Sequence, residues 1–493
     1  MKRFLSILLA FTFLSTVLST PLALKAQAFE GAVSSFPLSD VKTPLIVVRG
    51  VDLGAYYTDY GTEKQAPALG DLNAKVMLPP LVKGLAGMFW EGSLEPLLDQ
   101  VFELVESILG KLSYDKAGNP AYALGQNRYP LSVANYYDEL VTNGGNGAEE
   151  GIVKGAAERF GAQNVYYFTY DWRENPFKIS DELAQTIDRA LADHECDKVN
   201  LICASMGGLE AVAYFDKHGY EKIDKCVFLS AAFYGLYMVS DLFCGRVDIE
   251  ADNLYNFIAG MAADNRPLEI FLKGLKIAGA FKLVEFFADK ILEKYKGKLF
   301  DELLTDTLAT MPVWWALILP EDYEEALGFL FEGREDEYAG IIEISKQLQT
   351  MMQNRDAILK EAEDAGVSFS VISAYNRPAL PLYARAGANS DGGLETALIS
   401  GGATVAEYGK RLDGGFAGAY LSPDGVIDAS TCIFPDSTWF IKNGQHVGCG
   451  YQSQQAEFLF DLIAYEGKAM VNTWPEYPQY LIAGQSQSLG SLK

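Results

Sequence analysis

Short apolar runs alternate with helix-like segments along most of this chain. Five of these runs are rich in β-branched and aromatic side chains and are bounded by polar or turn residues, which predicts buried strands. The predicted strands are 45–48, 165–170, 199–204, 226–229 and 367–372. Strands and helices in alternation indicate an α/β protein with a mostly parallel central sheet flanked by helices. Ligands of such sheets bind at the carboxyl ends of the strands.

Helical spacing of apolar residues is clearest in two places. After Ser180, a candidate N-cap, Leu183 and Ile187 would share one face of a helix. Between the fourth and fifth predicted strands, about 130 residues repeat apolar positions at helical spacing. We predict that residues 236–366 form a helical cap, inserted before the penultimate core strand.

The predicted organisation is therefore a core in two parts, residues 29–235 and 367–493, with the cap between them. A second insertion, at about 56–164, interrupts the first part of the core. It is rich in Gly, Tyr and Asn and contains fewer clean helical patterns. Its role is not indicated by the sequence.

The N-terminus has the pattern of an export signal. Lys2 and Arg3 precede an apolar run, and Ala26-Gln27-Ala28 is a small-x-small cleavage site. We predict a signal peptide over 1–28, cleavage after Ala28 and a secreted or extracytoplasmic mature chain. An uncleaved membrane anchor is the alternative, but the apolar run is shorter than the roughly 20 residues that a spanning helix needs.

The chain is strongly acidic. Its formal net charge is −25, and removal of residues 1–28 takes away three basic residues and no acids, which gives −28. Such a surface repels nucleic acid and anionic lipid head groups, so neither is expected as a partner. The charge says little about a neutral ester.

Six cysteines in an exported chain are candidates for disulfide bonds. Cys432 and Cys449 are the best candidate pair, and closing a loop of that size would stabilise the fold by about 3 kcal/mol. Cys196 and Cys226 stand at the starts of neighbouring predicted strands and could also be joined. Cys203 lies within a strand and is expected to be a small buried apolar residue. No spacing resembles a zinc site, and we expect neither a metal nor a cofactor.

The stretch VNLICASMGGLEAVAYF, residues 199–215, places a serine between a predicted strand and a predicted helix. A serine nucleophile needs such a sharp turn, with small neighbours and a helix N-terminus that favours developing negative charge. Ser205 has these features, with Gly207 and Gly208 two and three residues after it. Cys203 stands where the G-x-S-x-G motif has its first glycine. An ordinary serine in a tight turn is the alternative interpretation.

A serine nucleophile also needs a general base, nearly always histidine, held by a carboxylate. The chain has three histidines. His194 precedes the nucleophile strand at its amino end, and His218 lies along the following helix, roughly 20 Å from Ser205. His446 follows the last predicted strand, where the chain order Ser–acid–His places the base. By elimination, His446 is the predicted base.

Two aspartates compete for the role of the acid. Asp391 lies in a loop after the 367–372 strand, and Asp436 lies ten residues before His446. We favour Asp391, because the loop that contains Asp436 delivers the histidine itself. Asp436 after a proline is typical of a turn.

The predicted oxyanion hole consists of two backbone N–H groups. One belongs to Met206, directly after the nucleophile, and the other to the loop after the first strand, for which Val51 is the best candidate. A simple turn is the alternative for this loop. In the cap, Trp314 and Trp315 are candidates for contact with an acyl substrate, although aromatic residues at such spacing are more often part of a helical core.

Several short motifs occur in one order along the chain: YDWR at 170–173, SMGG at 205–208, FYG at 233–235, SDG at 390–392 and the late His446. With these motifs the chain resembles the α/β-hydrolases, and within them the lecithin:cholesterol acyltransferase-like lipases and esterases. The resemblance implies an α/β-hydrolase fold and a triad of Ser205, Asp391 and His446 that needs no cofactor. It also implies that Trp172, from YDWR, lies near the substrate cleft.

The sequence departs from this family at two places. Ala204 and Cys203 precede the serine where histidine and a glycine or alanine are usual, and the loop VVRGVDLG at 47–54 replaces a proline- and glycine-rich form. The expected function is an exported serine hydrolase for carboxylic esters of lipids or other acyl groups, with acyltransferase activity where an alcohol replaces water. A lipid substrate would bring transient contact with a membrane or lipid surface. The alternatives are an inactive surface binding protein and an amidase or peptidase with the same triad.

Overall fold

The structure is a computed structural model, which describes residues 43–52, 56–68, 83, 103, 110–143, 148–248, 250–261, 266–279, 281–282, 285, 299–413, 418–448, 453–484 and 488–493. The predicted signal peptide, 1–28, lies outside these residues and remains a prediction. Cys449 also lies outside them, but the buried thiol of Cys432 is free, so the predicted Cys432–Cys449 disulfide is wrong. Within the described part, no helix is long and apolar enough to cross a membrane.

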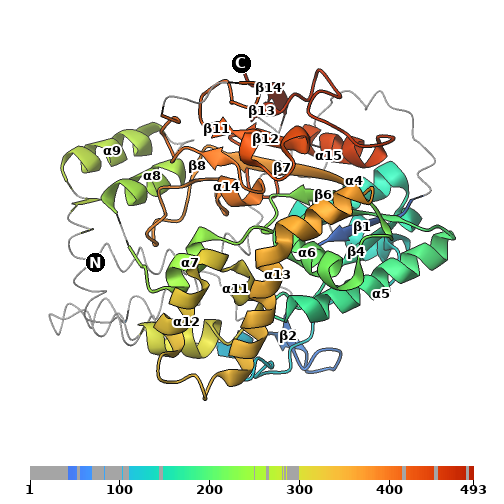
Figure 1. The fold of residues 1–493 in the computed structure, drawn as a ribbon, viewed down its shortest axis with the longest axis horizontal. Coiled ribbons are helices and arrows are strands. Elements are labelled where there is room, and N and C mark those ends of the chain that lie inside the picture. Colours follow the sequence, from blue (N-terminus) through green and yellow to red (C-terminus); the bar gives the residue numbers. More distant parts are fainter. Residues whose placement is uncertain are drawn as a thin grey trace.

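An eight-stranded sheet forms the centre of the molecule (Figure 1). Its strand order is β14-β13-β12-β7-β6-β5-β1-β4, and all neighbours are parallel except the edge pair β13 and β14. The strands are β1 Leu45–Val48, β4 Val165–Phe168, β5 Val199–Ala204, β6 Ile223–Leu229, β7 Ser368–Tyr375, β12 Thr438–Lys442, β13 Tyr480–Ala483 and β14 Leu489–Ser491. The predicted α/β architecture with a mostly parallel sheet is confirmed.

Three short antiparallel pairs lie outside this sheet. They are β2 Tyr57–Thr58 with β3 Ala66–Pro67, β8 Arg377–Pro378 with β9 Asn389–Ser390, and β10 Thr404–Val405 with β11 Ile427–Asp428.

All five predicted strands are present, but the strand after the helical insertion is not the penultimate one. Three strands of the sheet, β12, β13 and β14, follow β7. β12 extends the sheet by pairing with β7 over its whole length, and β13 then pairs with β12. These strands are short, and the burial of Trp439, Ile441 and Leu481 comes from helices packed on the sheet, not from a local pattern.

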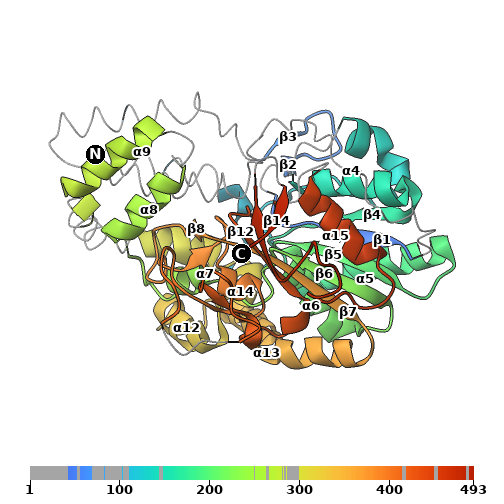
Figure 2. The same ribbon diagram turned by 90° about the horizontal axis from the view of Figure 1, so that it is seen from above.

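Helices cover both faces of the sheet. The described helices are α4 Ala148–Phe160, α5 Pro176–His194, α6 Gly207–His218, α7 Tyr237–Phe243, α8 Ala251–Met261, α9 Arg266–Ile277, α11 Pro312–Leu317, α12 Tyr323–Phe331, α13 Ala339–Asp364, α14 Thr396–Ile399 and α15 Gln454–Ala464. Alternate strand residues face opposite sides: Ile46 and Val48 pack with α5, α6 and α13, whereas Leu45 and Val47 pack with α4 and α15. Figure 2 shows these helices on the two sides of the sheet.

Helix α5 begins one turn earlier than the sequence pattern suggests. Its N-cap is Asn175, whose side chain accepts a hydrogen bond from Phe177 N at 2.9 Å, and Pro176 occupies the first helical position. The predicted cap, Ser180, lies inside the helix and donates its hydroxyl to Phe177 O at 2.8 Å. The prediction was wrong because the Asn-Pro pair is a stronger start signal than an isolated serine.

Residues 236–366, predicted as a helical cap, contain α7, α8, α9, α11, α12 and α13 between β6 and β7. Helices α8 and α9 lie at one end of the molecule, away from the centre of the sheet (Figures 1 and 2). Helix α13 packs on both α6 and α11, so this segment connects the core to the rest of the helical insertion. Its status as a separate cap domain remains a prediction.

The predicted disulfide between Cys196 and Cys226 is wrong, because both thiols are free. β6 begins at Ile223, three residues before Cys226, so Cys226 lies inside the sheet. There its Sγ lies 3.9 Å from Cys203 Sγ on the neighbouring strand. Cys196 lies outside the strands, between α5 and β5.

Candidate active site

Ser205 lies on a sharp turn between β5 and α6, at the carboxyl end of a central strand. Its φ is 50°, in the left-handed region that residues other than glycine rarely adopt. Two hydrogen bonds hold the turn: Ser205 N donates to Leu229 O at 3.0 Å, and Ala232 N donates to Ser205 O at 2.8 Å. A strained serine between a strand and a helix projects its hydroxyl beyond the sheet, as a nucleophile requires.

The residues around Ser205 are small because the surrounding backbone leaves no room. A Cβ atom on Gly207 would lie 2.7 Å from Val48 O. Cys203, which stands two residues before the serine, is fully buried in the sheet. It is a small buried residue, as predicted, and its thiol fills the place of the usual glycine.

The loop after β1 touches the nucleophile at Gly50. A Cβ atom on Gly50 would lie 2.7 Å from Ser205 Cβ and 3.2 Å from Ser205 Oγ, so only glycine fits there. Two buried side chains hold this loop. Tyr170, from YDWR, donates its hydroxyl to Arg49 O at 2.7 Å, and Arg49 Nη2 donates to Gln126 Oε1 at 2.8 Å.

His446 lies in the loop after β12, and β7 and β6 lie between β12 and the strand that precedes Ser205. Both residues follow the carboxyl ends of their parallel strands. His446 Nε2 is 2.9 Å from Ser205 Oγ, and its Nδ1 is 2.7 Å from Asp391 Oδ2. A proton on Nδ1 gives the arrangement in which the ring donates to the carboxylate and accepts from the serine hydroxyl. The other two histidines lie elsewhere, His194 at the end of α5 and His218 at the end of α6, where it pairs with Asp181.

Asp391 is almost fully buried, and backbone groups fix its carboxylate. Oδ1 accepts hydrogen bonds from Gly393 N at 2.8 Å and Leu394 N at 2.7 Å, which leaves Oδ2 for His446. The competing Asp436 is exposed, and its Oδ1 accepts from the Tyr420 hydroxyl at 2.8 Å. The structure therefore brings Asp391 to the histidine and leaves Asp436 outside the site.

The electrostatic surroundings of His446 favour its protonated form. Burial lowers the pKa of His446, but the carboxylate of Asp391, and with it that of Glu149, outweighs burial and holds the pKa above the usual 6.5. A more basic imidazole accepts the serine proton more readily. It also requires a higher pH before it is free to act as a base.

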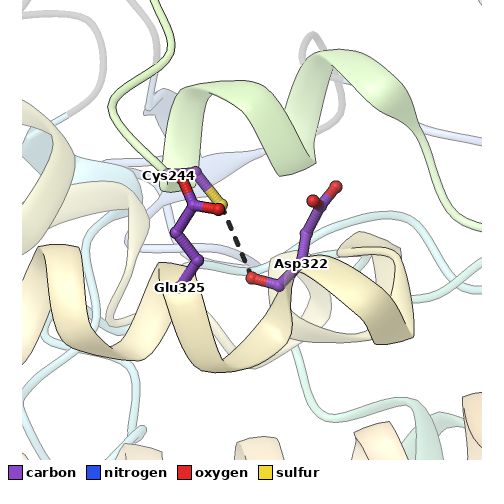
Figure 3. A group of neighbouring side chains, drawn as sticks. All are labelled: Cys244, Asp322 and Glu325. Atoms are coloured by element: carbon purple, nitrogen blue, oxygen red, sulfur yellow. Dashed lines mark hydrogen bonds between the residues drawn. The ribbon is translucent and has the colours of Figure 1, made fainter.

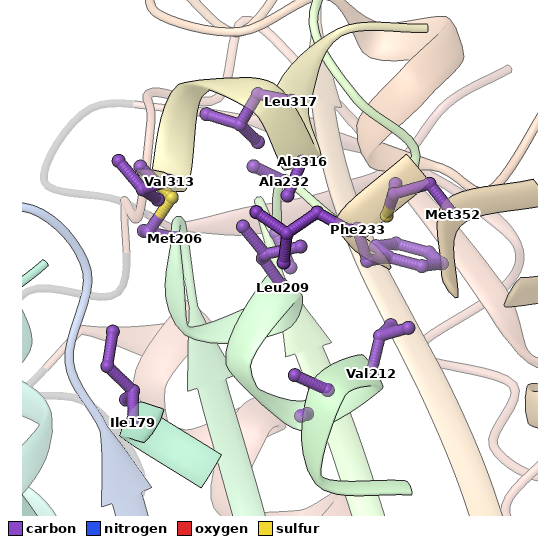
Figure 4. Close-up of a cluster of buried hydrophobic side chains, with 14 of the residues drawn as sticks. Ile179, Met206, Leu209, Val212, Ala232, Phe233, Val313, Ala316, Leu317 and Met352 are labelled. Atoms are coloured by element: carbon purple, nitrogen blue, oxygen red, sulfur yellow. The ribbon is translucent and has the colours of Figure 1, made fainter. Parts of the chain in front are cut away.

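Of the two predicted oxyanion donors, Met206 directly follows the serine, and Val51 follows Gly50, which lies against the serine side chain. In the part of the chain that the structure describes, no hydrogen bond uses the N–H of Met206 or of Val51. The Met206 side chain packs in the buried cluster that contains Val313 and Leu317 of α11 (Figure 4), and Val51 packs against the same cluster. The packing of these two side chains thus fixes the positions of the N–H groups of Met206 and Val51.

The three candidate tryptophans divide into two groups. Trp172 and Trp314 meet edge to face with ring centroids 5.7 Å apart, and both are buried with an indole N–H that lacks a partner among the described residues. Trp315 donates its N–H to Ala309 O at 2.7 Å and stacks on Phe331. Trp315 therefore has the contacts of a residue in the core of the helical insertion.

Sequence reasoning missed Glu149, the second residue of α4. The Cβ position on Gly50 that lies 3.2 Å from Ser205 Oγ also lies 3.0 Å from Glu149 Oε1. The carboxylate and the nucleophile thus border the same small space above Gly50. No motif marks this glutamate, because its place depends on where α4 meets the loop after β1.

Cys244, Asp322 and Glu325 place a thiol and two carboxylates close together, as a metal site would (Figure 3). Two guanidinium groups already bind these acids: Arg246 Nη2 lies 2.8 Å from Asp322 Oδ1, and Arg385 Nη2 lies 2.6 Å from Asp322 Oδ2. Arg246 also pairs with Glu325. The positive charge that a metal ion would supply comes from arginine, so this group is an ion-pair network between the helical insertion and the loop before β9.

The described residues thus join a strained serine, a histidine and a buried aspartate from three separate loops in one hydrogen-bonded chain. The loop after β1 and the start of α4 complete the surroundings of the serine. Comparison of the chain with protein-family models, with curated proteins and with solved structures found no match.

Proposed function

We propose that this protein has an α/β-hydrolase fold and is a serine hydrolase that cleaves carboxylic esters through an acyl-enzyme on Ser205. The observation that carries the proposal is the chain from Ser205 Oγ to His446 Nε2 at 2.9 Å and from His446 Nδ1 to Asp391 Oδ2 at 2.7 Å. The strand-to-helix turn at the serine and the chain order Ser–Asp–His support it further.

Acylation follows from this geometry. Ser205 Oγ attacks the ester carbonyl carbon as its proton passes to His446 Nε2, and the Asp391 carboxylate stabilises the imidazolium that forms. The carbonyl oxygen becomes negative and accepts hydrogen bonds from the N–H groups of Met206 and Val51. The N-terminus of α6, directly behind Ser205, adds a favourable dipole.

The tetrahedral intermediate then collapses, and His446 gives its proton to the leaving alcohol. A water molecule takes the place of the alcohol, loses a proton to His446 Nε2 and attacks the acyl group, which releases the acid and restores Ser205. An alcohol in place of this water would give acyl transfer with the same residues.

The surroundings of the serine support an apolar acyl group as the substrate class. Met206, directly after the nucleophile, belongs to a large buried apolar cluster that also contains Trp172 and Trp314. Neutral lipid or other acyl esters fit both this environment and the acidic surface. Export across a membrane, as the N-terminal pattern predicts, would place the activity outside the cytoplasm.

Turnover of p-nitrophenyl esters of increasing acyl length tests this proposal. The purified protein should hydrolyse these esters through an acyl-enzyme, and wherever deacylation is slower than acylation it should release a burst of about one p-nitrophenol per active site. A folded protein that hydrolyses none of these esters, and none of the corresponding anilides, would contradict the proposal. An inactive surface binding protein would then explain the fold better.

Replacement of Gly50 by alanine should lower kcat by at least about a hundredfold, because the new methyl group must displace the Ser205 side chain from His446. The matched control is Gly328→Ala on α12, where a Cβ atom meets nothing within 4 Å. We expect this control to retain full activity. Equal activity of both variants would show that the loop after β1 does not touch the working nucleophile.

A further inference from the structure

Glu149 brings a second carboxylate to the site, on the side of the nucleophile. One point above Gly50 lies 3.0 Å from Glu149 Oε1 and 3.2 Å from Ser205 Oγ, and Ser205 Oγ in turn lies 2.9 Å from His446 Nε2. Asp391 is bound to Nδ1, at the other end of the imidazole ring. Asp391 thus binds the Nδ1 end of the ring, and Glu149 lies near the serine that is bound to the Nε2 end; only Asp391 belongs to the proposed triad.

The position of Glu149 is fixed by the fold. Helix α4 packs on β1 and β4, and Glu149 lies in its first turn, where the helix N-terminus favours a negative side chain. The loop after β1 is held from the other side by Tyr170 and by Arg49. Helix α4 therefore fixes the position of the Glu149 carboxylate, and the hydrogen bonds of the loop after β1 fix the position of Gly50.

The charged and titratable groups that face this carboxylate come from several elements. Arg49 and Asp52 lie in the loop after β1, His446 in the loop after β12, Tyr167 on β4 and Tyr170 in the loop after β4. Burial raises the pKa of Glu149, whereas its own backbone N–H, His446 and Arg49 oppose this effect. His446 is the one group in this set that changes charge during the proposed reaction.

We propose that Glu149 is a positioning residue of this site, whose carboxylate stabilises the imidazolium form of His446 from the Ser205 end of the ring while Asp391 stabilises it from the other. The proposal rests on the proposed function. The serine proton arrives on Nε2, and the positive charge then created lies on the side of Glu149. The carboxylate also borders the space of the reacting ester, so it disfavours substrates with an anionic group next to the carbonyl.

The sign of the pH effect follows directly. His446 must be neutral to act as a base, so kcat/KM should rise with pH through the pKa of His446, which lies above 6.5. Both carboxylates raise this pKa. Loss of the Glu149 charge should therefore move the acid limb of the profile to lower pH and leave a less basic histidine on the plateau.

The test is the pH profile of kcat/KM for a neutral ester in the Glu149→Gln variant, compared with Glu150→Gln, which removes one carboxylate from the same helical turn. We expect the acid limb of Glu149→Gln to lie at lower pH and its plateau to fall about tenfold. Glu150→Gln should match the wild type, and Glu149→Asp, which keeps the charge, should restore most of the acid limb. A Glu149→Gln profile with an unshifted acid limb would overturn the inference.

A second measurement separates this inference from the proposed function. The chain has only three histidines, so ¹³Cε1-labelled histidine gives three resonances that the variants His194→Gln and His218→Gln assign. An NMR titration then gives the pKa of His446 without any substrate. A pKa that falls in Glu149→Gln supports the inference even if no ester is turned over, and an unchanged pKa overturns it even in an active enzyme.

Discussion

Replacement of His446 by alanine is expected to lower kcat for ester hydrolysis by about 10⁶-fold, to the level of Ser205→Ala. The reason is the single contact between Nε2 and Ser205 Oγ at 2.9 Å, because no other base reaches the hydroxyl in the described structure. The double variant should be no slower than either single variant, since the two groups act as one unit. Assays with p-nitrophenyl butyrate measure kcat for each single variant and for the double variant. Circular dichroism shows whether each variant is folded.

The other two histidines provide matched controls. His194→Ala and His218→Ala remove the same ring from the ends of α5 and α6, and both should keep wild-type kcat. A His446→Ala variant that is folded and retains even a hundredth of the wild-type rate would show that another group activates Ser205.

Replacement of Asp391 by asparagine should lower kcat by about 10⁴-fold. The amide keeps the volume but removes the charge that stabilises the imidazolium, and it can turn the histidine into the wrong tautomer. Asp436→Asn is the control, because Asp436 is exposed and binds Tyr420, not His446. Activity lost in Asp436→Asn and kept in Asp391→Asn would reverse the assignment of the acid.

The backbone around Asp391 makes this variant informative. Oδ1 accepts two backbone N–H groups, so an asparagine that keeps its oxygen there must direct its NH₂ group toward His446 Nδ1. The NH₂ group cannot accept a hydrogen bond from the N–H at Nδ1. The loss should therefore appear in kcat with little change in the stability of the fold, which thermal unfolding of the variant would check.

Those parts of the site that depend on local pattern could be predicted from the sequence. The strand before Ser205 is a short apolar run, and two glycines follow the serine at a distance of two and three residues. This pattern can be recognised without knowledge of the fold. His446 could be predicted as the base because the chain has only three histidines, and not because of the residues around it. Asp391 followed from chain order and from its place after the predicted strand.

The parts that depend on tertiary packing could not be predicted. Glu149 is an ordinary acidic residue at the start of a helix, and it gains its place only because α4 begins next to Gly50. β12 and β13 are short strands whose core residues, such as Trp439, are buried by α15. Val51 was chosen from the place of its loop after the first strand, and the close approach of the neighbouring Gly50 to Ser205 could not be predicted from the sequence.

Reaction with a fluorophosphonate, followed by mass spectrometry of the labelled peptide, tests most directly whether Ser205 is an activated nucleophile. We expect one label per chain, on Ser205, at a rate that rises with pH as His446 loses its proton. Folded wild-type protein that takes no label, or takes it on a serine other than Ser205, would show that Ser205 is not the nucleophile.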